Sequence, residues 1–464
     1  MRWFEIEYKD PLSYANALVG RQLAFLDSAR FHPQLGRYSF IGFDPFDQFI
    51  AFEDHLIFSG KSYPASDIFT FLKNFFKDFT FKKDERYPFP FAGGAIGYFS
   101  YDLVRKIEKI GELSVKDNHF PLIHLYFYDV FLAFDHANQK AFLVASGLSP
   151  LSSESNCRKI LSFLNQVKKK ITDIYFLETD EDNEDVNLTS NFSKEYYLET
   201  VNRIKKHIVE GDIFQANLSQ RFSGEIPSLE AWELYKNLRK VNPAPFSAYI
   251  GCADTKIAST SPERFLFLKD KAVQARPIKG TRPRSTNSLQ DEALAEELLK
   301  SEKDKAENAM IVDLMRNDLS RVCEEHTVKV SQWCGLESFE TVHHLVSVVE
   351  GRLRREYDAF DLLKATFPGG SITGAPKIRA MQILESLEPT QRGPYCGSIG
   401  YISFDGSMDL SIVIRTLLIE KDHVSFQVGG GIVLDSDAEA EYQETLIKAR
   451  ALEKALKCYQ RMYS

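Results

Sequence analysis

Residues 397–434, GSIGYISFDGSMDLSIVIRTLLIEKDHVSFQVGGGIVL, contain three stretches rich in β-branched and aromatic residues. Such stretches predict strands near 397–404, 409–418 and 424–434, and a long helix is expected to follow them. The strands therefore come as a block, without the β-α alternation that is typical of a parallel sheet. This order favours an α+β fold with mostly antiparallel sheets.

The chain upstream of this block shows the same grouping. Apolar residues between Tyr197 and Ile208 recur at helical spacing, and Gly211 is placed to end that helix. In residues 214–222 apolar and polar side chains alternate, which predicts a half-buried strand with a polar second face. The remaining expected elements are two helices and a strand, at 289–300, 303–319 and 340–350.

Composition divides the chain into three regions. Residues 1–175 are expected to form short strands and a few helices, and residues 193–464 contain most of the elements named above. Between them, residues 176–192 include an acidic stretch with few apolar side chains, which predicts a solvated linker or loop.

Charge and composition exclude several classes of function. The 464 residues are 44% hydrophobic, which is enough for a sizeable core. The formal net charge is −8 and lysines and arginines form no block, so neither nucleic acid nor an anionic membrane is expected as a partner. An anionic substrate must therefore be held by a few local cations or by a metal ion.

Cysteine usage and the first residues indicate the compartment. The six cysteines lie far apart and form no C-x-x-C pair, which argues against a zinc site and a disulfide framework. The N-terminus is charged, and no run of about eighteen apolar residues occurs. We therefore expect a soluble, reduced, cytoplasmic protein.

The expected C-terminal helix carries charged residues on one face. Glu441, Glu444 and Lys448 fall at positions i, i+3 and i+7 of that face. Ser436 and Glu439 form a capping-box pattern at the start of the helix. A solvated face with a helical ion pair and a binding site both fit this pattern.

Two further features are unusual in a strand and a helix. Gly429, Gly430 and Gly431 are consecutive, which indicates either a close approach to the backbone, as by an anion, or a plain turn. Glu307 lies on the apolar stripe of its helix, where a carboxylate is costly unless it forms a salt bridge or binds a metal. Two such carboxylates brought together would repel, and Mg²⁺ would relieve the repulsion.

A glycine-rich segment, residues 367–377 (FPGGSITGAPK), is superficially like a P-loop. Ala375 and Pro376 stand where Gly-Lys-Ser/Thr is required, so the P-loop interpretation fails. A glycine-rich turn that leads into a helix remains, and it fits either an anion site or a simple helix start.

A basic segment and a histidine pair complete the candidates. Lys279 lies among three arginines within residues 276–284, which would lower its pKa and make it a nucleophile. A solvated basic loop is the alternative. His343 and His344 face opposite ways in a strand, and one of them is expected to be a core histidine.

Taken together and in order, these segments resemble the chorismate-utilising enzymes. That family includes the large subunits of anthranilate synthase and aminodeoxychorismate synthase, and the isochorismate synthases. The resemblance is dense over residues 193–455 and looser in the N-terminal half. The matching segments are Gly211–Phe222, Ser261–Arg264, Pro277–Thr281, Asp313–Asp318, Val342–Ser347, Phe367–Lys377, Gly429–Glu444, Gly36–Gly42 and Gly93–Tyr98.

The resemblance implies a fold like that of anthranilate synthase component I. Two large antiparallel β-sheets would pack around a core, with helices outside. Residues 193–464 would form the chorismate-binding catalytic region, and residues 1–175 the N-terminal region of the same fold.

The resemblance also implies roles for single residues. Glu307, Glu441 and Glu444 match the Mg²⁺ ligands, and the metal would hold the ring carboxylate of chorismate. Glu263 matches the general acid/base, and His344 matches the histidine near the departing hydroxyl group. The substrate-binding residues would be Ser371, Tyr395, Arg415, Lys448 and the backbone at Gly429, Gly430 and Gly431.

Lys279 is the position that separates members of the family. Anthranilate synthases carry alanine there, whereas aminodeoxychorismate synthases carry a lysine that attacks carbon 2 of the ring before ammonia adds at carbon 4. Isochorismate synthases have a water-activating lysine where this chain has Gln215. The resemblance thus implies amino-group transfer of the transaminase class, which makes 4-amino-4-deoxychorismate for 4-aminobenzoate and folate. Anthranilate synthase and a non-catalytic ligand-sensing relative are the alternatives.

A regulatory pocket and a partner are implied in the same way. Ser28, Tyr38, Pro245 and Phe246 match a tryptophan pocket of the family, and whether tryptophan binds here is open. No glutaminase signature occurs in the sequence. A separate glutamine amidotransferase subunit is therefore expected to supply ammonia, in a heterodimer.

Overall fold

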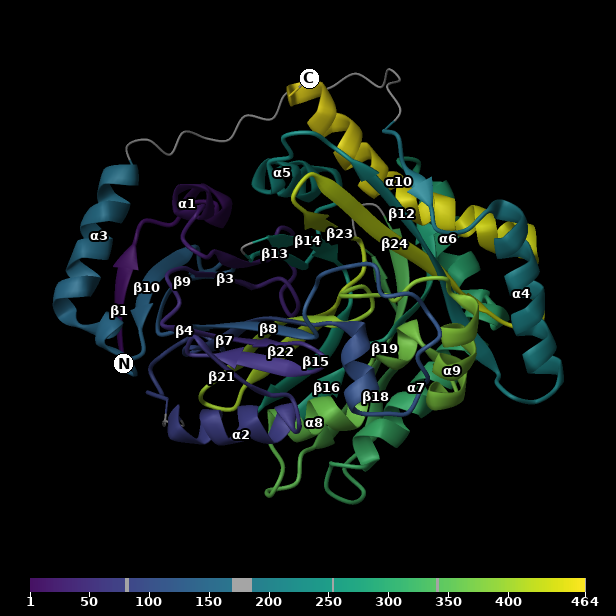
Figure 1. Cartoon of the computed structure of the whole chain (residues 1–464), viewed down its shortest axis with the longest axis horizontal. Helices are drawn as coiled ribbons and strands as arrows, with labels where there is room; N and C mark the ends of the chain where they lie inside the picture. The colour runs from purple at the N-terminus through teal and green to yellow at the C-terminus, as the bar shows by residue number, and fades with distance from the viewer. Residues whose placement is uncertain (80–82, 169–185, 253, 339–341, 464) are drawn as a thin grey trace.

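The computed structural model describes residues 1–79, 83–168, 186–252, 254–338 and 342–463 (Figure 1). Their strands form two large sheets, and the pairings between neighbouring strands are antiparallel. Helices lie outside the sheets, so the predicted α+β architecture is confirmed. Part of the expected acidic linker at 176–192 lies outside the described residues. None of the described helices is long and apolar enough to cross a membrane.

The first sheet takes strands from both halves of the chain. In spatial order its strands are β1 (Arg2–Ile6), β10 (Lys140–Ala145), β9 (Val130–Asp135), β3 (Tyr38–Gly42), β2 (Ala24–Asp27), β13 (Phe246–Gly251), β14 (Thr255–Ser261), β23 (Thr416–Glu420), β24 (His423–Ile432), β12 (Gln215–Glu225) and β11 (Thr189–Ser190), and β20 (Gly374–Ala375) also pairs with β12.

The second sheet is built in the same way. Its strands are β17 (Ile278–Pro283), β19 (Val342–Arg352), β16 (Ala272–Ala275), β15 (Arg264–Lys269), β22 (Met408–Ile412), β21 (Ser398–Ser403), β7 (Gly94–Phe99), β8 (Ile123–Tyr128), β4 (Asp47–Ala51), β5 (His55–Phe58) and β6 (Lys61–Pro64), and β18 (Lys329–Ser338) pairs with β19.

The helices cover the outer faces of the two sheets (Figure 1). They are α1 (Pro11–Leu18), α2 (Ile68–Phe79), α3 (Glu154–Lys168), α4 (Lys194–Val209), α5 (Ala231–Val241), α6 (Ser288–Lys300), α7 (Glu302–Ser320), α8 (Ala359–Thr366), α9 (Lys377–Leu387) and α10 (Ala438–Tyr463), with short 3-10 helices η1 (Tyr101–Lys106), η2 (Pro150–Ser152) and η3 (Gly370–Ile372).

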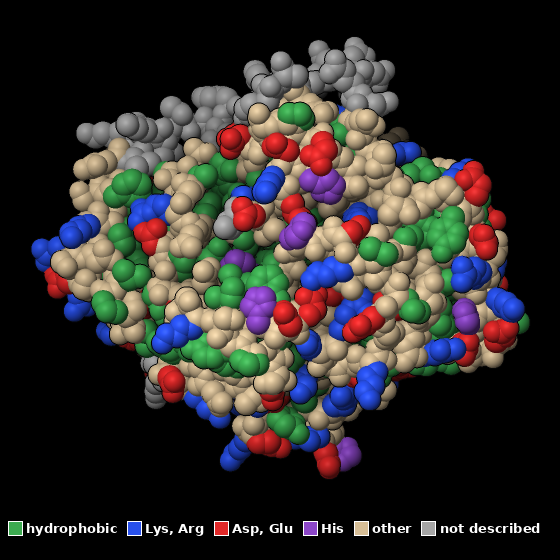
Figure 2. All heavy atoms as spheres, viewed as in Figure 1, with side chains coloured by type: hydrophobic (Ala, Val, Ile, Leu, Met, Phe, Trp, Pro, Cys, Tyr) green, Lys and Arg blue, Asp and Glu red, His purple; other side chains and the backbone are tan. Residues whose placement is uncertain are grey.

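Apolar side chains fill three main layers. An aromatic core between the two sheets includes Phe40 and Phe131 from the first sheet and Tyr98 and Tyr401 from the second. A second core packs α1, α3, α5 and α10 on the first sheet, and a third packs α2, α7 and α8 on the second. On the face in Figure 2, acidic and basic side chains are interspersed, so neither sign of charge dominates that face.

The predicted strand at 409–418 is wrong in one respect, because it is two strands in different sheets. β22 ends at Ile412 in the second sheet, and β23 begins at Thr416 in the first. The chain turns at Arg415, whose φ of 52° is uncommon for a residue with a side chain. Apolar residues run continuously from Ile412 to Ile414, so the sequence pattern did not reveal the turn.

The strand predicted at 214–222 is β12, but it is not half-buried. Its polar residues Gln215, Asn217 and Ser219 are at most 8% exposed, whereas Phe214 just before it is 65% exposed. Polar side chains on a strand usually mark a solvated face. Here the polar side chains face the interior, where Gln215 lies beside Gly431 and Ser219 binds Glu388, groups from distant parts of the chain.

The predicted capping box at the start of α10 is also wrong. The side chain of Asp437, not Ser436, accepts the hydrogen bond from the backbone N–H of Ala440. The hydroxyl of Ser436 instead donates to Glu441 at 2.6 Å. The carboxylate of Glu439 pairs with Lys194 on α4.

Candidate active site

Two crossings of the chain between the sheets lie side by side. One crossing, from β14 to β15, contains Glu263, and the other, from β22 to β23, contains Arg415. The backbone N–H of Ile412 donates to the carbonyl oxygen of Glu263 at 3.0 Å, and that of Thr260 donates to Arg415 at 3.1 Å. The two predicted site residues are therefore close in space although they are far apart in sequence.

Glu263 is a buried carboxyl group with an unusual pKa. It is 5% exposed, and burial raises its pKa from 4.5 to about 7. Its side chain hydrogen-bonds the predicted substrate-binding residue Ser371 on η3 and accepts from the backbone N–H of Ile278 at 3.5 Å. A carboxyl group with a pKa near neutrality can both donate and accept a proton, as a general acid/base must.

Lys279 follows Ile278 and lies in a β-bulge. In the pairing of β17 with β19, Ile278 faces Val346 and Thr281 faces His344, so β17 contains one extra residue between them. Gly280 takes a φ of 84° at this bulge. A bulge re-aims a side chain relative to a regular strand, and here the charge of Lys279 acts on both Glu263 and Glu307.

The pKa of Lys279 is lowered as predicted, but the predicted cause is wrong. The main cause is burial of the ammonium group, and the positive charge of Lys448 adds to it. The three neighbouring arginines are not among the main causes, and each is paired with a carboxylate of another segment. These pairs are Arg276 with Glu337, Arg282 with Glu297 and Asp304, and Arg284 with Asp291.

The three predicted metal ligands lie beside two of the consecutive glycines of β24. A Cβ atom on Gly430 would lie 3.1 Å from Oε2 of Glu441 and 3.5 Å from Oε1 of Glu444. A Cβ atom on Gly431 would lie 3.6 Å from Oε2 of Glu307. The glycines thus leave room for carboxylates from α7 and α10 beside one strand.

Local partners hold two of these carboxylates. Glu441 accepts from Ser436 and lies 3.9 Å from Lys303, and Glu444 pairs with Lys448 at 2.7 Å. Burial raises the pKa of Glu441, and the negative charge of Glu444 raises it further. Among the described residues, the ligand atoms of His207, Glu210 and Asp212 lie within 4.8 Å of one another near the surface. The oxygens of Glu307, Glu441 and Glu444 are farther apart than that.

The donor set fits a hard cation. Burial also raises the pKa of Glu307, with a further contribution from Glu441, so these carboxylates destabilise one another when ionised. Carboxylate oxygens are the ligands that Mg²⁺ prefers, and a divalent ion would offset the repulsion. The role of the metal stays a prediction.

A second group of predicted residues presents positive charge and hydrogen-bond donors. Arg415 forms no ion pair with any described residue, and burial lowers its pKa. An unpaired guanidinium group suits a carboxylate of the substrate. An electrostatic interaction with Tyr395 raises this pKa, so this buried phenol lies nearby. Lys448 donates to the carbonyl oxygen of Gly429 at 2.7 Å.

The two histidines of β19 have different surroundings. His344 contacts Thr281 at 2.8 Å, and burial followed by the charge of Arg415 lowers its pKa to about 4. His344 is therefore neutral near pH 7 and lies beside the site. His343 instead bonds Ser338 and Asp291 and belongs to the structural core.

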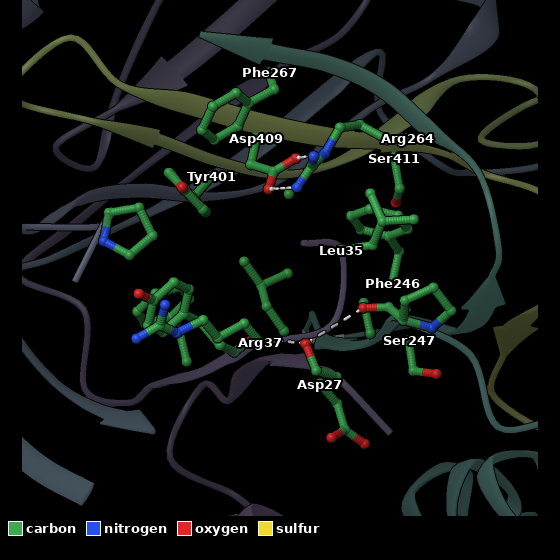
Figure 3. A pocket seen from close by; sticks show the side chains of 18 of the residues that line it. Asp27, Leu35, Arg37, Phe246, Ser247, Arg264, Phe267, Tyr401, Asp409 and Ser411 are labelled. Carbon is green, nitrogen blue, oxygen red and sulfur yellow. Dashed lines mark hydrogen bonds and ion pairs between the residues drawn. The ribbon is translucent and has the colours of Figure 1, made fainter. Parts of the chain in front are cut away.

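The four residues of the predicted tryptophan pocket line one cavity of about 250 Å³ next to this site. Ser28 donates to the carbonyl oxygen of Tyr38 at 2.6 Å and faces that of Pro245 at 3.4 Å. Figure 3 shows the opposite wall, where Arg264 forms a two-bond ion pair with Asp409. The ligand of the cavity stays a prediction.

Sequence reasoning missed several residues of both sites. Ser436 was interpreted as a helix cap although it binds Glu441. Arg264 and Asp409 were not assigned to the cavity, although Arg264 directly follows Glu263 in the motif. Their side chains come from paired strands 145 residues apart, a contact that no local pattern reveals.

Comparison with known proteins identifies the family of this chain. The family described as chorismate binding enzyme matches residues 25–454. Aminodeoxychorismate synthase component 1 of Escherichia coli K12 is 42% identical over 367 residues, 79% of this chain and 78% of that protein. The protein of that name in Bacillus subtilis 168 is 38% identical over 91% of this chain and 89% of its own length. Anthranilate synthase component 1 of Aquifex aeolicus VF5 is 38% identical over 97% of this chain and 93% of its own length.

Solved structures show the same fold. Anthranilate synthase component I from Streptococcus pneumoniae TIGR4 superposes with a TM-score of 0.78 at 35% identity, covering 91% of this chain and 93% of that one. The menaquinone-specific isochorismate synthase of Escherichia coli has a TM-score of 0.69 at 19% identity, covering 98% of this chain and 94% of that one, which shows the fold alone.

The chain belongs to the chorismate binding enzyme family. Within that family it is a chorismate-utilising enzyme of the anthranilate synthase and aminodeoxychorismate synthase type.

Proposed function

We propose that this chain converts chorismate and ammonia to 4-amino-4-deoxychorismate and water. The observation that carries the proposal is Lys279, whose amine lies in a bulge within electrostatic reach of Glu263 and Glu307 and has a lowered pKa. An amine near a general acid and a carboxylate cluster is suited to nucleophilic attack on a bound ring. The similarity to aminodeoxychorismate synthase component 1 over 79% to 91% of the chain supports the same assignment.

Substrate binding in this proposal uses both ends of the site. Mg²⁺ held by Glu307, Glu441 and Glu444 would bind the ring carboxylate of chorismate and neutralise its charge. Arg415, with Tyr395, would hold the second carboxylate. Two negative groups held at opposite ends fix the ring between Lys279 and Glu263, which lowers the entropic cost of reaching the transition state.

The first chemical step is displacement of the hydroxyl group. The neutral amine of Lys279 bonds to carbon 2, the ring double bonds shift, and the bond between carbon 4 and oxygen breaks. Glu263 donates a proton, so the hydroxyl group leaves as water. With a pKa of about 7, Glu263 is protonated in a large fraction of molecules at neutral pH.

The second step restores the ring. Ammonia bonds to carbon 4, the double bonds shift back, and the bond between carbon 2 and Lys279 breaks to release the amine. The new ammonium group returns one proton to Glu263. Chorismate and ammonia thus give the amino product and water, and both side chains are regenerated.

The source of ammonia is part of the proposal. Relatives are named component 1, which indicates a second component in those proteins. We propose that a glutamine amidotransferase subunit binds this chain and hydrolyses glutamine, and that 4-aminobenzoate and folate synthesis uses the product.

Anthranilate synthase is the second candidate, because relatives of that name match up to 99% of the chain. The two candidates differ in product. We expect the purified chain, given chorismate, Mg²⁺ and an ammonium salt, to form 4-amino-4-deoxychorismate without pyruvate. Equal amounts of anthranilate and pyruvate would refute the proposal and establish the alternative.

A further inference from the structure

One edge of β12 lacks a strand neighbour over a short interval. β20 pairs with Gln215 and Ala216, and β11 pairs with Phe222 and Ser223, which leaves residues 217–221 between them. The opposite edge of this interval pairs with the strand of the three glycines, Gly429–Gly431. Backbone groups on a buried strand edge need partners, and an unpaired one is costly.

At the two ends of this interval, the backbone N–H of Asn217 donates to the carbonyl oxygen of Thr373, and the backbone of Arg221 bonds Asn191. Two side chains supply partners between these points. The carboxylate of Glu388 accepts from the backbone N–H of Ser219 at 2.9 Å and from its hydroxyl at 2.8 Å. The guanidinium of Arg392 donates to the carbonyl oxygen of Asn217 at 2.7 Å. Arg392 and Glu388 bind each other through two hydrogen bonds of 2.8 Å and are 3% and 7% exposed. This ion pair takes the place of the missing strand, with a donor opposite a carbonyl group and an acceptor opposite an N–H group.

The same guanidinium holds a second segment. Arg392 also donates to the carbonyl oxygen of Ile372 at 3.0 Å. Ile372 follows Ser371, whose side chain hydrogen-bonds Glu263. One planar group with fixed donor directions therefore connects β12 to the segment that contacts Glu263.

We propose that Arg392 is a positioning residue, which together with Glu388 sets the distance between the acid/base carboxyl Glu263 and the carboxylates at Gly430 and Gly431. Stability alone is a weak reason for a buried ion pair, because well-packed apolar residues often serve equally well. Apolar residues would leave the backbone groups of β12 and of Ile372 unpaired. The inference rests on the proposed function only in that the test follows the consumption of chorismate.

The test compares Arg392→Lys with a matched control, Arg239→Lys. Lysine keeps the charge at position 392 but cannot span Glu388, Asn217 and Ile372 at once. Arg239 on α5 forms a similar pair with the buried Asp27 at 2.6 Å and also binds Asp10, and none of its hydrogen bonds goes to β12, Ile372 or Glu263. The readout is the rate of chorismate loss at several chorismate concentrations, whichever product forms, together with the melting temperature.

We expect Arg392→Lys to lower kcat on the order of 100-fold, as for a misplacement of about 1 Å, and to change KM by less than about threefold. Arg239→Lys should keep kcat within about threefold of the wild-type value, even if its melting temperature falls as much as that of Arg392→Lys. Glu388→Gln removes the charge without changing the shape of the side chain, and it should also lower kcat. This variant replaces Arg392→Lys in the test if Arg392→Lys does not fold.

Retention of kcat in Arg392→Lys and Glu388→Gln would overturn the inference, as would an equal loss of kcat in Arg239→Lys. A wild-type chain that forms anthranilate would overturn the proposed function instead and would leave the comparison of variants intact.

Discussion

The backbone N–H of Ile412 donates to the carbonyl oxygen of Glu263 at 3.0 Å, which joins the two crossings of the chain between the sheets. Through this bond the acid/base candidate Glu263 and the carboxylate-binding candidate Arg415 lie at one junction. The junction also separates the site from the cavity lined by Arg264 and Ser411.

Lys279→Ala should lower the rate of amino product formation by about 1000-fold or more, because the nucleophile is lost. The melting temperature should change by less than about 4 °C, since Lys279 makes no ion pair with a described residue and part of the residue stays exposed although its ammonium group is buried. Lys305→Ala is the control, as Lys305 pairs with Glu302 at the surface of the same helix that carries Glu307. Unchanged turnover in Lys279→Ala would rule out the covalent step.

Glu263→Gln should alter the pH dependence of stability. The folded-state pKa of Glu263 is about 7, above its ordinary 4.5, so between these pH values the unfolded chain ionises while the folded chain stays protonated. This group therefore lowers the free energy of unfolding as the pH rises through that window, by about 3 kcal/mol in total. Denaturant unfolding should show that the free energy of unfolding falls less between pH 5 and pH 8 in the variant than in the wild type. Parallel changes in the two proteins would contradict the buried, protonated carboxyl group.

Gly430→Ala should weaken the metal site, since the new Cβ would lie 3.1 Å from Glu441 and 3.5 Å from Glu444. We expect the Mg²⁺ concentration for half-maximal activity to rise about tenfold, as when groups that orient metal ligands are changed. Gly251→Ala is the matched control, because its Cβ meets Tyr249 at 3.3 Å and no carboxylate. The same Mg²⁺ requirement in both variants would argue against the proposed ligands.

Tryptophan, if it occupies the cavity beside Ser28, should raise the melting temperature in a concentration-dependent way, because a ligand that binds only the folded state stabilises it. Ser28→Leu should abolish this shift, since the larger side chain would project into a cavity of about 250 Å³ and remove the hydroxyl that bonds Tyr38. Phenylalanine and tyrosine titrations show whether the indole ring is required. A shift that persists in Ser28→Leu would assign tryptophan to another site.

Local patterns predicted most elements and the acidic face of α10. Helical spacing located α4, α6 and α7, and β-rich stretches located β19, β21 and β24. These predictions succeeded because each depends on residues within about ten positions, where the periods of helix and strand differ. The motif resemblance, not a local period, indicated Glu263, Glu307 and Glu444 as site candidates.

Tertiary structure alone decided how these groups act. The sequence suggested that three arginines lower the pKa of Lys279, yet they bind carboxylates of other segments and burial has the main effect. Ser436 binds Glu441, and Arg392 completes the edge of β12, because strands and helices from distant parts of the chain meet there. Burial and hydrogen-bond partners depend on such long-range packing, so no local sequence pattern specifies them.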